Sequence, residues 1–275
     1  MKKITRRSFL AAAGLSVAAL ALTACGGSSS SVASSVASSA AASSEAAAGE
    51  LTTVEAGKLT MATNATFPPY EMTTDSGDIE GIDVETAQAI ADKLGLELQI
   101  DDMDFDAALL SVQQGKADIV MAGVTVTDER KAVMDFSDSY ATGIQSIIVP
   151  EGSDIASPDD LAGKKIGTQR GTTGYIYCSD DFGDDAVVAY DNGLTAVQAL
   201  NNGQVDAVVI DNAPAKEYVA ANPGLTILDT SYAEEDYAIG MAKGSSLESA
   251  VNAALEELKA DGTLQAIVDK YITAE

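Results

Sequence analysis

From Lys58 onward, short apolar segments of the kind found in β-strands alternate with stretches whose apolar residues recur at helical spacing. Residues 59–63 and 96–100 are predicted strands, and residues 83–94 and 105–113 are predicted helices. Apolar residues make up 46% of the chain, which is enough for a globular core. Regular alternation predicts helices packed in layers on largely parallel strands, so we expect an α/β fold.

The pattern occurs twice, and two segments resemble each other in sequence. Residues 108–122 are ALLSVQQGKADIVMA and residues 196–210 are AVQALNNGQVDAVVI, so each combines a helix, two amides, a glycine, an aspartate and an apolar strand. This repetition places Thr125 and Asp211 at comparable positions after the two strands. Ligands of open α/β sheets bind beyond the carboxyl ends of the strands, so we predict a site in a cleft between two lobes.

The C-terminal residues 246–271 have the spacing of an amphipathic helix interrupted at residues 261–263. Its return to the first half would make the chain connect the two halves twice, which suits a hinge. We therefore expect one lobe made of residues 53–142 and 237–275, and a second lobe made of residues 143–236.

The charge balance is strongly acidic, with 16 lysine and arginine residues against 42 aspartate and glutamate residues and no histidine. A nucleic-acid-binding protein needs a basic surface, so we expect no nucleic-acid partner. The lack of histidine excludes Ser-His-Asp triads and His-ligated metal centres, and Cys25 and Cys178 are too few for a zinc site or a disulfide scaffold. We expect no metal, no cofactor and no catalytic residue.

The first 24 residues have the composition of an export signal, with four basic residues before an apolar run too short for an ordinary membrane span. The Arg6-Arg7 pair fits a twin-arginine signal, and a general secretory signal that carries paired arginines fits equally well. Residues 22–25, LTAC, resemble a bacterial lipobox, which predicts cleavage before Cys25 and a diacylglyceryl group on its thiol. Removing the four positive charges of this segment from the net −26 leaves −30 on the rest of the chain.

Serine, alanine and glycine dominate residues 25–52. Such a composition buries too little apolar surface to offset the entropy lost on ordering, so we expect a flexible tether. Lipidated Cys25 would then anchor the globular part outside the cytoplasm, on the outer face of the cell membrane or on its periplasmic side.

Eight short motifs follow one another over most of the chain. They are ATNATFPPY (62–70), GIDVE (81–85), DIVMAGVTVTDER (118–130), DFSD (135–138), GKKIG (163–167), RGTTG (170–174), VDAVVID (205–211) and DGTL (261–264). In this order they resemble the bacterial extracellular solute-binding proteins of family 3, the polar amino-acid-binding lipoproteins of ABC transporters. The resemblance implies a bilobed, periplasmic-binding-protein-like fold (type II), a monomer that is not an enzyme, and delivery of a free amino acid to an ABC permease.

The resemblance also implies roles for single residues. Arg130 would bind the α-carboxylate of the ligand, since a guanidinium matches a carboxylate with two parallel hydrogen bonds. Thr125 would add its hydroxyl, Gly123 its carbonyl to the α-ammonium, and Thr173 lies at a helix start, where N–H groups bind anions. Asp211 would pair with the α-ammonium. From the residues alone, a surface position in a helix that begins at Asp128 is favoured for Arg130, and only the resemblance favours a binding role. Asp211 and the threonines also fit helix caps.

The side chain of the ligand would lie against Phe67 and Phe105, which the resemblance implies as aromatic walls. Asn64 stands where members that bind cationic side chains often have aspartate, so we expect a polar, neutral amino acid. Further candidate contacts are Tyr70, Ala122, Arg170 and Gly174.

Other functions are compatible with the same residues. An enzyme on this scaffold, such as a dehydratase, could use carboxylates of the cleft as acid and base, although no motif points to a particular reaction. A receptor for a cationic or acidic amino acid, an extracytoplasmic sensor and a surface lipoprotein without a ligand are the remaining alternatives.

Overall fold

A computed structural model describes residues 51–272. The predicted export signal (residues 1–24), the predicted lipidation site Cys25 and residues 25–50 of the predicted tether lie outside the described residues. Between residues 51 and 272, no helix is long and apolar enough to cross a membrane.

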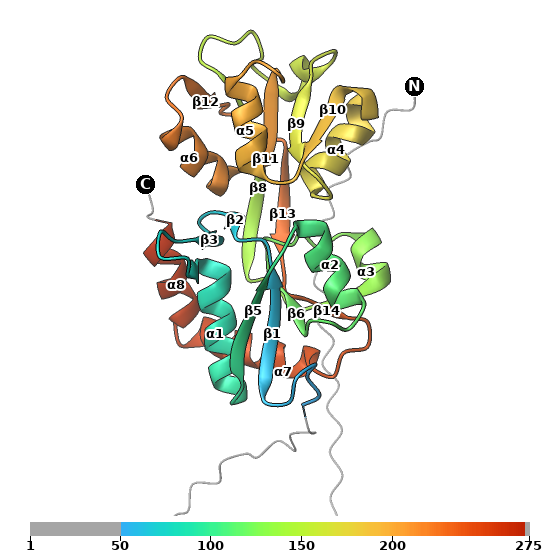
Figure 1. The fold of residues 1–275 in the computed structure, drawn as a ribbon, viewed down its shortest axis with the longest axis vertical. Helices are drawn as coiled ribbons and strands as arrows, with labels where there is room; N and C mark the ends of the chain where they lie inside the picture. Colours follow the sequence, from blue (N-terminus) through green and yellow to red (C-terminus); the bar gives the residue numbers. More distant parts are fainter. Residues whose placement is uncertain (1–50, 273–275) are drawn as a thin grey trace, which may run out of the picture. The chain divides into compact units, whose positions relative to one another are not determined.

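The first lobe is built on a five-stranded sheet (Figure 1). In spatial order its strands are β5 (Glu97–Asp102), β1 (Lys58–Thr63), β6 (Ile119–Val120), β14 (Gly240–Ala242) and β7 (Met134–Phe136). Its helices are α1 (Ile82–Leu94), α2 (Phe105–Gln113), α3 (Asp128–Val133), α7 (Glu248–Ala260) and α8 (Thr263–Tyr271). A small antiparallel sheet precedes α1 and consists of β2 (Thr66–Phe67), β3 (Glu71–Thr73) and β4 (Ile79–Glu80).

The second lobe is built on a six-stranded sheet. Five of its strands follow the order β10 (Val187–Tyr190), β9 (Ile166–Gln169), β11 (Ala207–Asp211), β8 (Ala141–Pro150) and β12 (Leu225–Ile227), and β13 (Ala233–Tyr237) also pairs with β8. Its α-helices are α4 (Thr173–Phe182), α5 (Gly193–Asn201) and α6 (Asn212–Ala221). Two short 3₁₀ helices complete it, η1 (Pro158–Leu161) and η2 (Asp184–Ala186).

The chain crosses between the lobes twice. It leaves the first sheet after β7 and enters the second along β8, and it returns from β13 to β14. Strands β8 and β13 are antiparallel, with Ala141 opposite Tyr237, and together they connect the two lobes (Figure 1). These two strands are therefore the covalent and hydrogen-bonded link between the lobes.

The expectation of largely parallel strands is right only where helices connect the strands. Strands β5, β1 and β6 are parallel, as are β10, β9 and β11, because parallel neighbours need a crossover connection. Strand β8 is antiparallel to each of its neighbours, and so is β14. Both take part in the interlobe crossings, so they enter or leave their sheet without a helical crossover.

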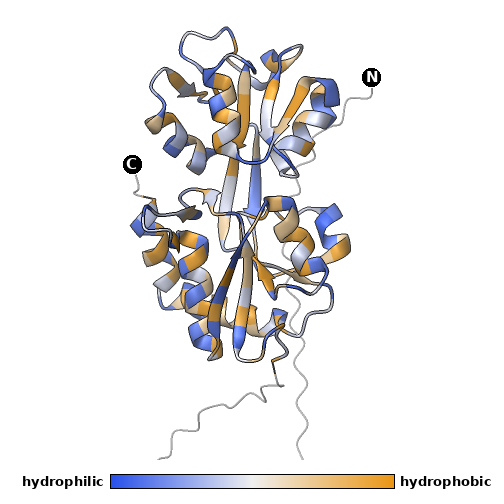
Figure 2. Cartoon of the chain, viewed as in Figure 1, coloured by the Kyte–Doolittle hydropathy of each residue, from blue (hydrophilic) through white to orange (hydrophobic). Residues whose placement is uncertain are grey.

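Helix α1 shows how local sequence determines an element of the core. Val84, Ala87, Ile90 and Ala91 recur at helical spacing, and all four are buried. The helix ends where the sequence predicts, because Gly95 adopts a left-handed conformation (φ 69°) and its N–H bonds to carbonyls of the last turn. Figure 2 shows hydrophobic and hydrophilic residues mixed along each helix, as expected for helices with one buried face.

The C-terminal helices pack on the first lobe, as their apolar spacing predicts. Val251, Leu255 and Leu258 of α7 are buried and belong to the same apolar cluster as Ile90 of α1. The first lobe is therefore completed by a segment that lies at the far end of the sequence.

Gly81 is a position where only glycine fits. Its φ of 137° is unfavourable for other residues, and a Cβ atom there would lie 2.2 Å from the carbonyl oxygen of Tyr70. Gly81→Ala is expected to lower the free energy of unfolding by about 2–4 kcal/mol, because backbone strain and a backbone clash add together. Urea unfolding followed by circular dichroism measures this loss.

Gly77 provides the matched control. It also has a positive φ (89°), but no atom lies within 4 Å of its hypothetical Cβ, so Gly77→Ala should lose only about 1 kcal/mol. Equal losses in the two variants would contradict the assignment of a steric role to Gly81.

Candidate functional site

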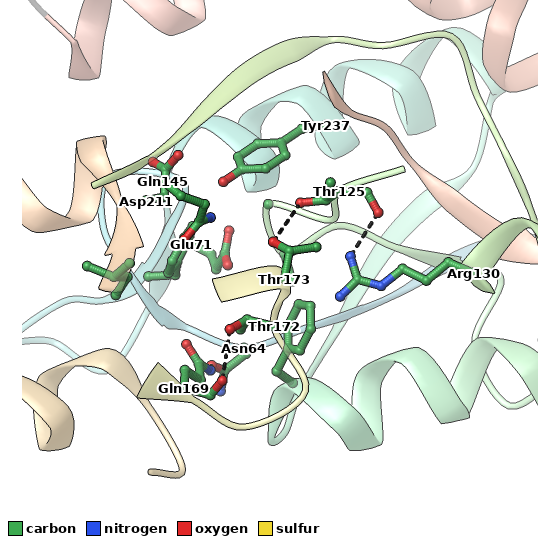
Figure 3. Close-up of a pocket in the computed structure, with 15 residues that line it drawn as sticks. Asn64, Glu71, Thr125, Arg130, Gln145, Gln169, Thr172, Thr173, Asp211 and Tyr237 are labelled. Atoms are coloured by element: carbon green, nitrogen blue, oxygen red, sulfur yellow. Dashed lines mark hydrogen bonds between the residues drawn. The ribbon is translucent and has the colours of Figure 1, made fainter. Parts of the chain in front are cut away.

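A cavity lies between the lobes (Figure 3). From the first lobe it is lined by Asn64, Phe67, Glu71, Phe105, Ala122, Gly123, Thr125 and Arg130. From the second lobe and the β13 strand it is lined by Gln145, Gln169, Thr172, Thr173, Ile210, Asp211 and Tyr237.

The structure brings together most of the residues singled out in the sequence. All eight principal candidates line the cavity: Asn64, Phe67, Phe105, Gly123, Thr125, Arg130, Thr173 and Asp211. Ala122, a further candidate, lines it as well. Their common location is a structural finding, whereas their roles toward a ligand stay predictions.

Three further candidates do not line the cavity. Tyr70 lies behind the wall, where its ring is 5.8 Å from that of Phe67 and 5.4 Å from that of Tyr237, so it supports both. Arg170 is exposed to solvent and lies 4.0 Å from Asp191. Gly174 is buried in the first turn of α4, and a Cβ there would meet Gln145 and the Val209 backbone rather than open space.

Arg130 is buried rather than a surface residue. Helix α3 begins after Thr127, whose hydroxyl accepts the N–H of Arg130, and this turn directs the side chain inward. The guanidinium donates to the Thr125 carbonyl at 2.8 Å and to the Gly171 carbonyl at 3.1 Å, and it lies 5.4 Å from the centre of the Phe105 ring. Burial lowers its pKa, but an arginine stays charged in proteins. Two of its five N–H donors are thus used by main-chain carbonyls.

Helix α4 begins at the cavity. The Thr172 hydroxyl caps it by accepting the N–H of Tyr175, so the cap predicted as an alternative is present. Thr173 follows, and its hydroxyl lies 3.4 Å from that of Thr125 across the lobes. A helix N-terminus carries partial positive charge, so Arg130 and α4 make this part of the cavity attractive to an anion.

Asp211 ends strand β11 and caps helix α6. Its carboxylate accepts the N–H of Ala213 at 3.0 Å and the N–H of Ile144 at 2.7 Å. Burial raises the pKa of Asp211 to about 6, and these two hydrogen bonds oppose that shift. The capping role is present, and the same carboxylate faces the cavity beside Tyr237 (Figure 3).

Asn64 is occupied by protein partners. Its amide nitrogen donates to the Met103 carbonyl at 2.9 Å, and its amide oxygen accepts from Thr66 at 3.0 Å and from Gln169 of the second lobe at 2.9 Å. Its missing charge therefore does not by itself favour a neutral ligand.

Glu71 is the most important residue that the sequence analysis missed. It is fully buried in β3, lines the cavity, and neither carboxyl oxygen has a hydrogen-bond partner within residues 51–272. Burial, and after it the nearby Asp83 carboxylate, raise the pKa of Glu71 well above its usual range. Asp83 in turn accepts the N–H of Gly123 at 3.0 Å, and burial raises its pKa to about 6.

The signal for Glu71 was weak, because a lone glutamate in a strand normally faces solvent. Other missed residues could have been found from topology. Gln169 and Ile210 lie at the carboxyl ends of β9 and β11, where α/β sheets bind ligands, and Gln145 and Tyr237 lie on the interlobe strands.

The fold and the cavity define a bilobed binding protein, in which a cavity lies between two α/β lobes. The sequence matches the bacterial extracellular solute-binding proteins, family 3, over residues 59–274, and the chain belongs to this family. Since the family consists of solute-binding proteins, the expectation that the chain is not an enzyme is confirmed. Among residues 51–272, no cluster of histidine, cysteine, aspartate or glutamate could hold a metal ion.

Relatives of known or assigned ligand cover most of the chain. It is 34% identical over 274 residues to a probable histidine-binding protein of Neisseria gonorrhoeae, covering 96% of this chain and 95% of the relative. It is 34% identical over 226 residues to the L-cystine-binding protein TcyJ of Escherichia coli strain K12, and the match covers 80% of this chain and 85% of the relative. An ancestral arginine-binding protein bound to glutamine has a similar structure, with a TM-score of 0.76, 43% identity, and coverage of 79% of this chain and 99% of that one.

The raised pKa of Asp83 predicts an unusual dependence of stability on pH. Its pKa is about 6 in the folded protein and about 3.9 when unfolded, so between these values the folded state binds more protons. Lowering the pH from 7 to 5 should therefore stabilise the fold through this group by about 1 kcal/mol. The gain should be absent from Asp83→Asn, which retains an acceptor for the Gly123 N–H.

Urea unfolding at pH 7 and pH 5 tests this difference. Asp92→Asn, at an exposed position of the same helix, is the control. Its free energy of unfolding should change between pH 7 and pH 5 by as much as that of the wild type. The same pH response in Asp83→Asn and in the wild type would show that Asp83 does not titrate in this range.

Proposed function

We propose that this chain is the extracytoplasmic receptor of an ABC importer for a polar L-amino acid. One observation carries the proposal: a single cavity presents a buried guanidinium and a helix N-terminus together with a buried carboxylate. A free amino acid is a zwitterion, and this combination complements both of its charges. The amino-acid ligands named for the relatives support the same class of solute.

The groups of the cavity divide naturally between the parts of such a ligand. Arg130, with the start of α4 at Thr173, would bind the α-carboxylate, and Asp211 would bind the α-ammonium. Phe67 and Phe105 would then enclose the ligand side chain between aromatic rings.

The charge balance of the site favours a basic side chain. Four buried carboxyl groups lie in or next to the cavity, and Arg130 is its one lining cation among the described residues; the carboxyl groups are Glu71, Asp83, Asp211 and Glu235. A cationic ligand would supply the missing positive charge and donors for the two unpartnered oxygens of Glu71. We therefore propose arginine or a similar amino acid as the ligand.

A polar neutral ligand, which the sequence analysis favoured, is the second candidate. Its support is the raised pKa of Glu71, because a protonated carboxyl can pair with an amide side chain without a charge. The related arginine-binding protein bound to glutamine is consistent with this candidate.

Ligand capture would use closure of the lobes assigned from the sequence, residues 53–142 with 237–275 against residues 143–236. Hydrogen bonds already join them across the cleft: Gln169 donates to Asn64, Arg130 to the Gly171 carbonyl, and Tyr218 to the Thr66 carbonyl. A ligand that contacts both lobes binds the closed state more tightly and shifts the population toward it. Lipidated Cys25 and its tether would keep the receptor beside a permease in the membrane.

Removing Arg130 tests the α-carboxylate contact. Arg130→Ala should weaken amino-acid binding by about 2–5 kcal/mol, which is roughly 30-fold or more, because the ligand carboxylate loses its charged partner. Isothermal titration calorimetry measures the change. The exposed Arg170 offers a matched control, and Arg170→Ala should bind as the wild type does; unchanged binding by Arg130→Ala would remove it from the site.

Replacing Glu71 separates the two candidate ligands. L-arginine and L-citrulline have almost the same shape, but only arginine carries a side-chain charge. Glu71→Gln should weaken binding of arginine by about 10- to 100-fold and binding of citrulline by less than about threefold, since only the cation loses a counter-charge. Glu80→Gln, at an exposed position of the neighbouring β4 strand, is the control.

Calorimetry in buffers of different ionisation enthalpy adds a second readout. A cation next to Glu71 lowers the raised pKa of that carboxyl, so arginine binding should release protons and strengthen as the pH rises. Wild-type protein that binds citrulline as tightly as arginine, with no proton release, would favour the neutral candidate.

A further inference from the structure

Glu235 is a buried carboxylate that lies behind the cavity wall rather than in it. It belongs to β13, one of the two strands that connect the lobes, and its Cα is paired with that of Gly143 on β8. Only 6% of its surface is exposed. A charged residue is rarely buried to this extent unless it has specific partners.

Those partners are two residues that line the cavity, one from each lobe. Oxygen Oε2 of Glu235 accepts the hydroxyl of Thr125 at 3.0 Å and the amide nitrogen Nε2 of Gln145 at 3.0 Å. The other oxygen, Oε1, is buried and has no hydrogen-bond partner in the described part of the chain. One carboxylate thus holds side chains on both sides of the interlobe link.

The contact determines what Thr125 presents to the cavity. A hydroxyl has a single proton, and the proton of Thr125 points to Glu235. In the 3.4 Å pair across the lobes, Thr173 is therefore the donor and Thr125 the acceptor (Figure 3). Toward a solute, Thr125 offers lone pairs rather than a proton, so it suits a cationic group and not a carboxylate.

Glu235 also contributes to the electrostatics of the site. Arg130 is the cation that faces it, while Tyr177, Tyr237 and Asp211 surround it from the neighbouring elements. Arg130 donates its hydrogen bonds to main-chain carbonyls. The Glu235 carboxylate therefore adds negative charge near Arg130 without using any of its N–H donors.

We propose that Glu235 is a positioning residue that takes the only proton of Thr125 and so makes its oxygen an acceptor for the α-ammonium of the ligand. This inference rests on the proposed amino-acid receptor function and differs from the expectation that the Thr125 hydroxyl helps to bind the carboxylate. It also links the hinge to the site, because the carboxylate that orients Thr125 holds Gln145 on the other interlobe strand.

The test compares two ligands that differ only in the α-amino group. L-arginine and guanidinovalerate are the probes, and L-glutamine and glutaramate replace them if the wild type binds glutamine instead. The quantity measured by competition calorimetry is the ratio of the two dissociation constants. A merely structural disturbance weakens both ligands alike and leaves this ratio unchanged.

Two substitutions separate the hydrogen bond from the charge. Glu235→Met fills a similar volume without an acceptor, and we expect it to reduce the preference for the amino acid by about tenfold or more. Glu235→Gln keeps an acceptor for Thr125 and loses the charge, and the preference should fall by less than about threefold. Glu234→Gln, at the neighbouring exposed position of β13, is the control.

Each outcome decides between the alternatives. An unchanged ratio in Glu235→Met, or an equal loss in Glu235→Gln and Glu235→Met, overturns the positioning role. If Glu235→Met does not fold, as judged by circular dichroism, Glu235→Asp takes its place, because the shorter side chain withdraws the acceptor and should give the same loss. Wild-type protein that binds no amino acid overturns the proposed function itself, and this inference with it.

Discussion

The site depends on one buried positive charge. A guanidinium removed from water must keep its hydrogen bonds, and Arg130 does so with the Thr125 carbonyl of the first lobe and the Gly171 carbonyl of the second. Because one acceptor comes from each lobe, the full set of partners exists only when the lobes meet. Full hydrogen bonding of the buried charge therefore depends on contact between the two lobes.

The buried carboxyl groups in and next to the cavity carry a desolvation cost. Burial raises the pKa of Glu71, Asp83 and Asp211, which means that the folded protein resists their ionisation. Such strain is typical of sites in which a ligand supplies the missing partner. The acidity of the whole chain is a separate property, because surface charge affects solubility and encounter while the cavity determines which solute fits.

Local sequence patterns predicted the elements well, and the family resemblance predicted much of the cavity. The predicted helix at residues 105–113 coincides with α2, and Gly95 ends α1 as expected. Some candidates next to lining residues do not line the cavity themselves. Gly174 follows Thr173 and Tyr70 lies near Phe67, yet neither lines the cavity, since nearby residues of a turn or helix point in different directions.

By itself the sequence determined the α/β alternation, the family, and the identities of Arg130 and Asp211 as charged residues near strand ends, because these depend on local periodicity and on motifs a few residues long. The tertiary structure alone decided that Asn64 is already paired with Gln169 and that Glu235 holds Thr125. These partners are 105 and 110 residues apart in the chain. Burial and hydrogen bonding of a side chain depend on which distant segments pack together. The order of the residues along the chain does not show this packing, so these contacts could not be predicted from the sequence.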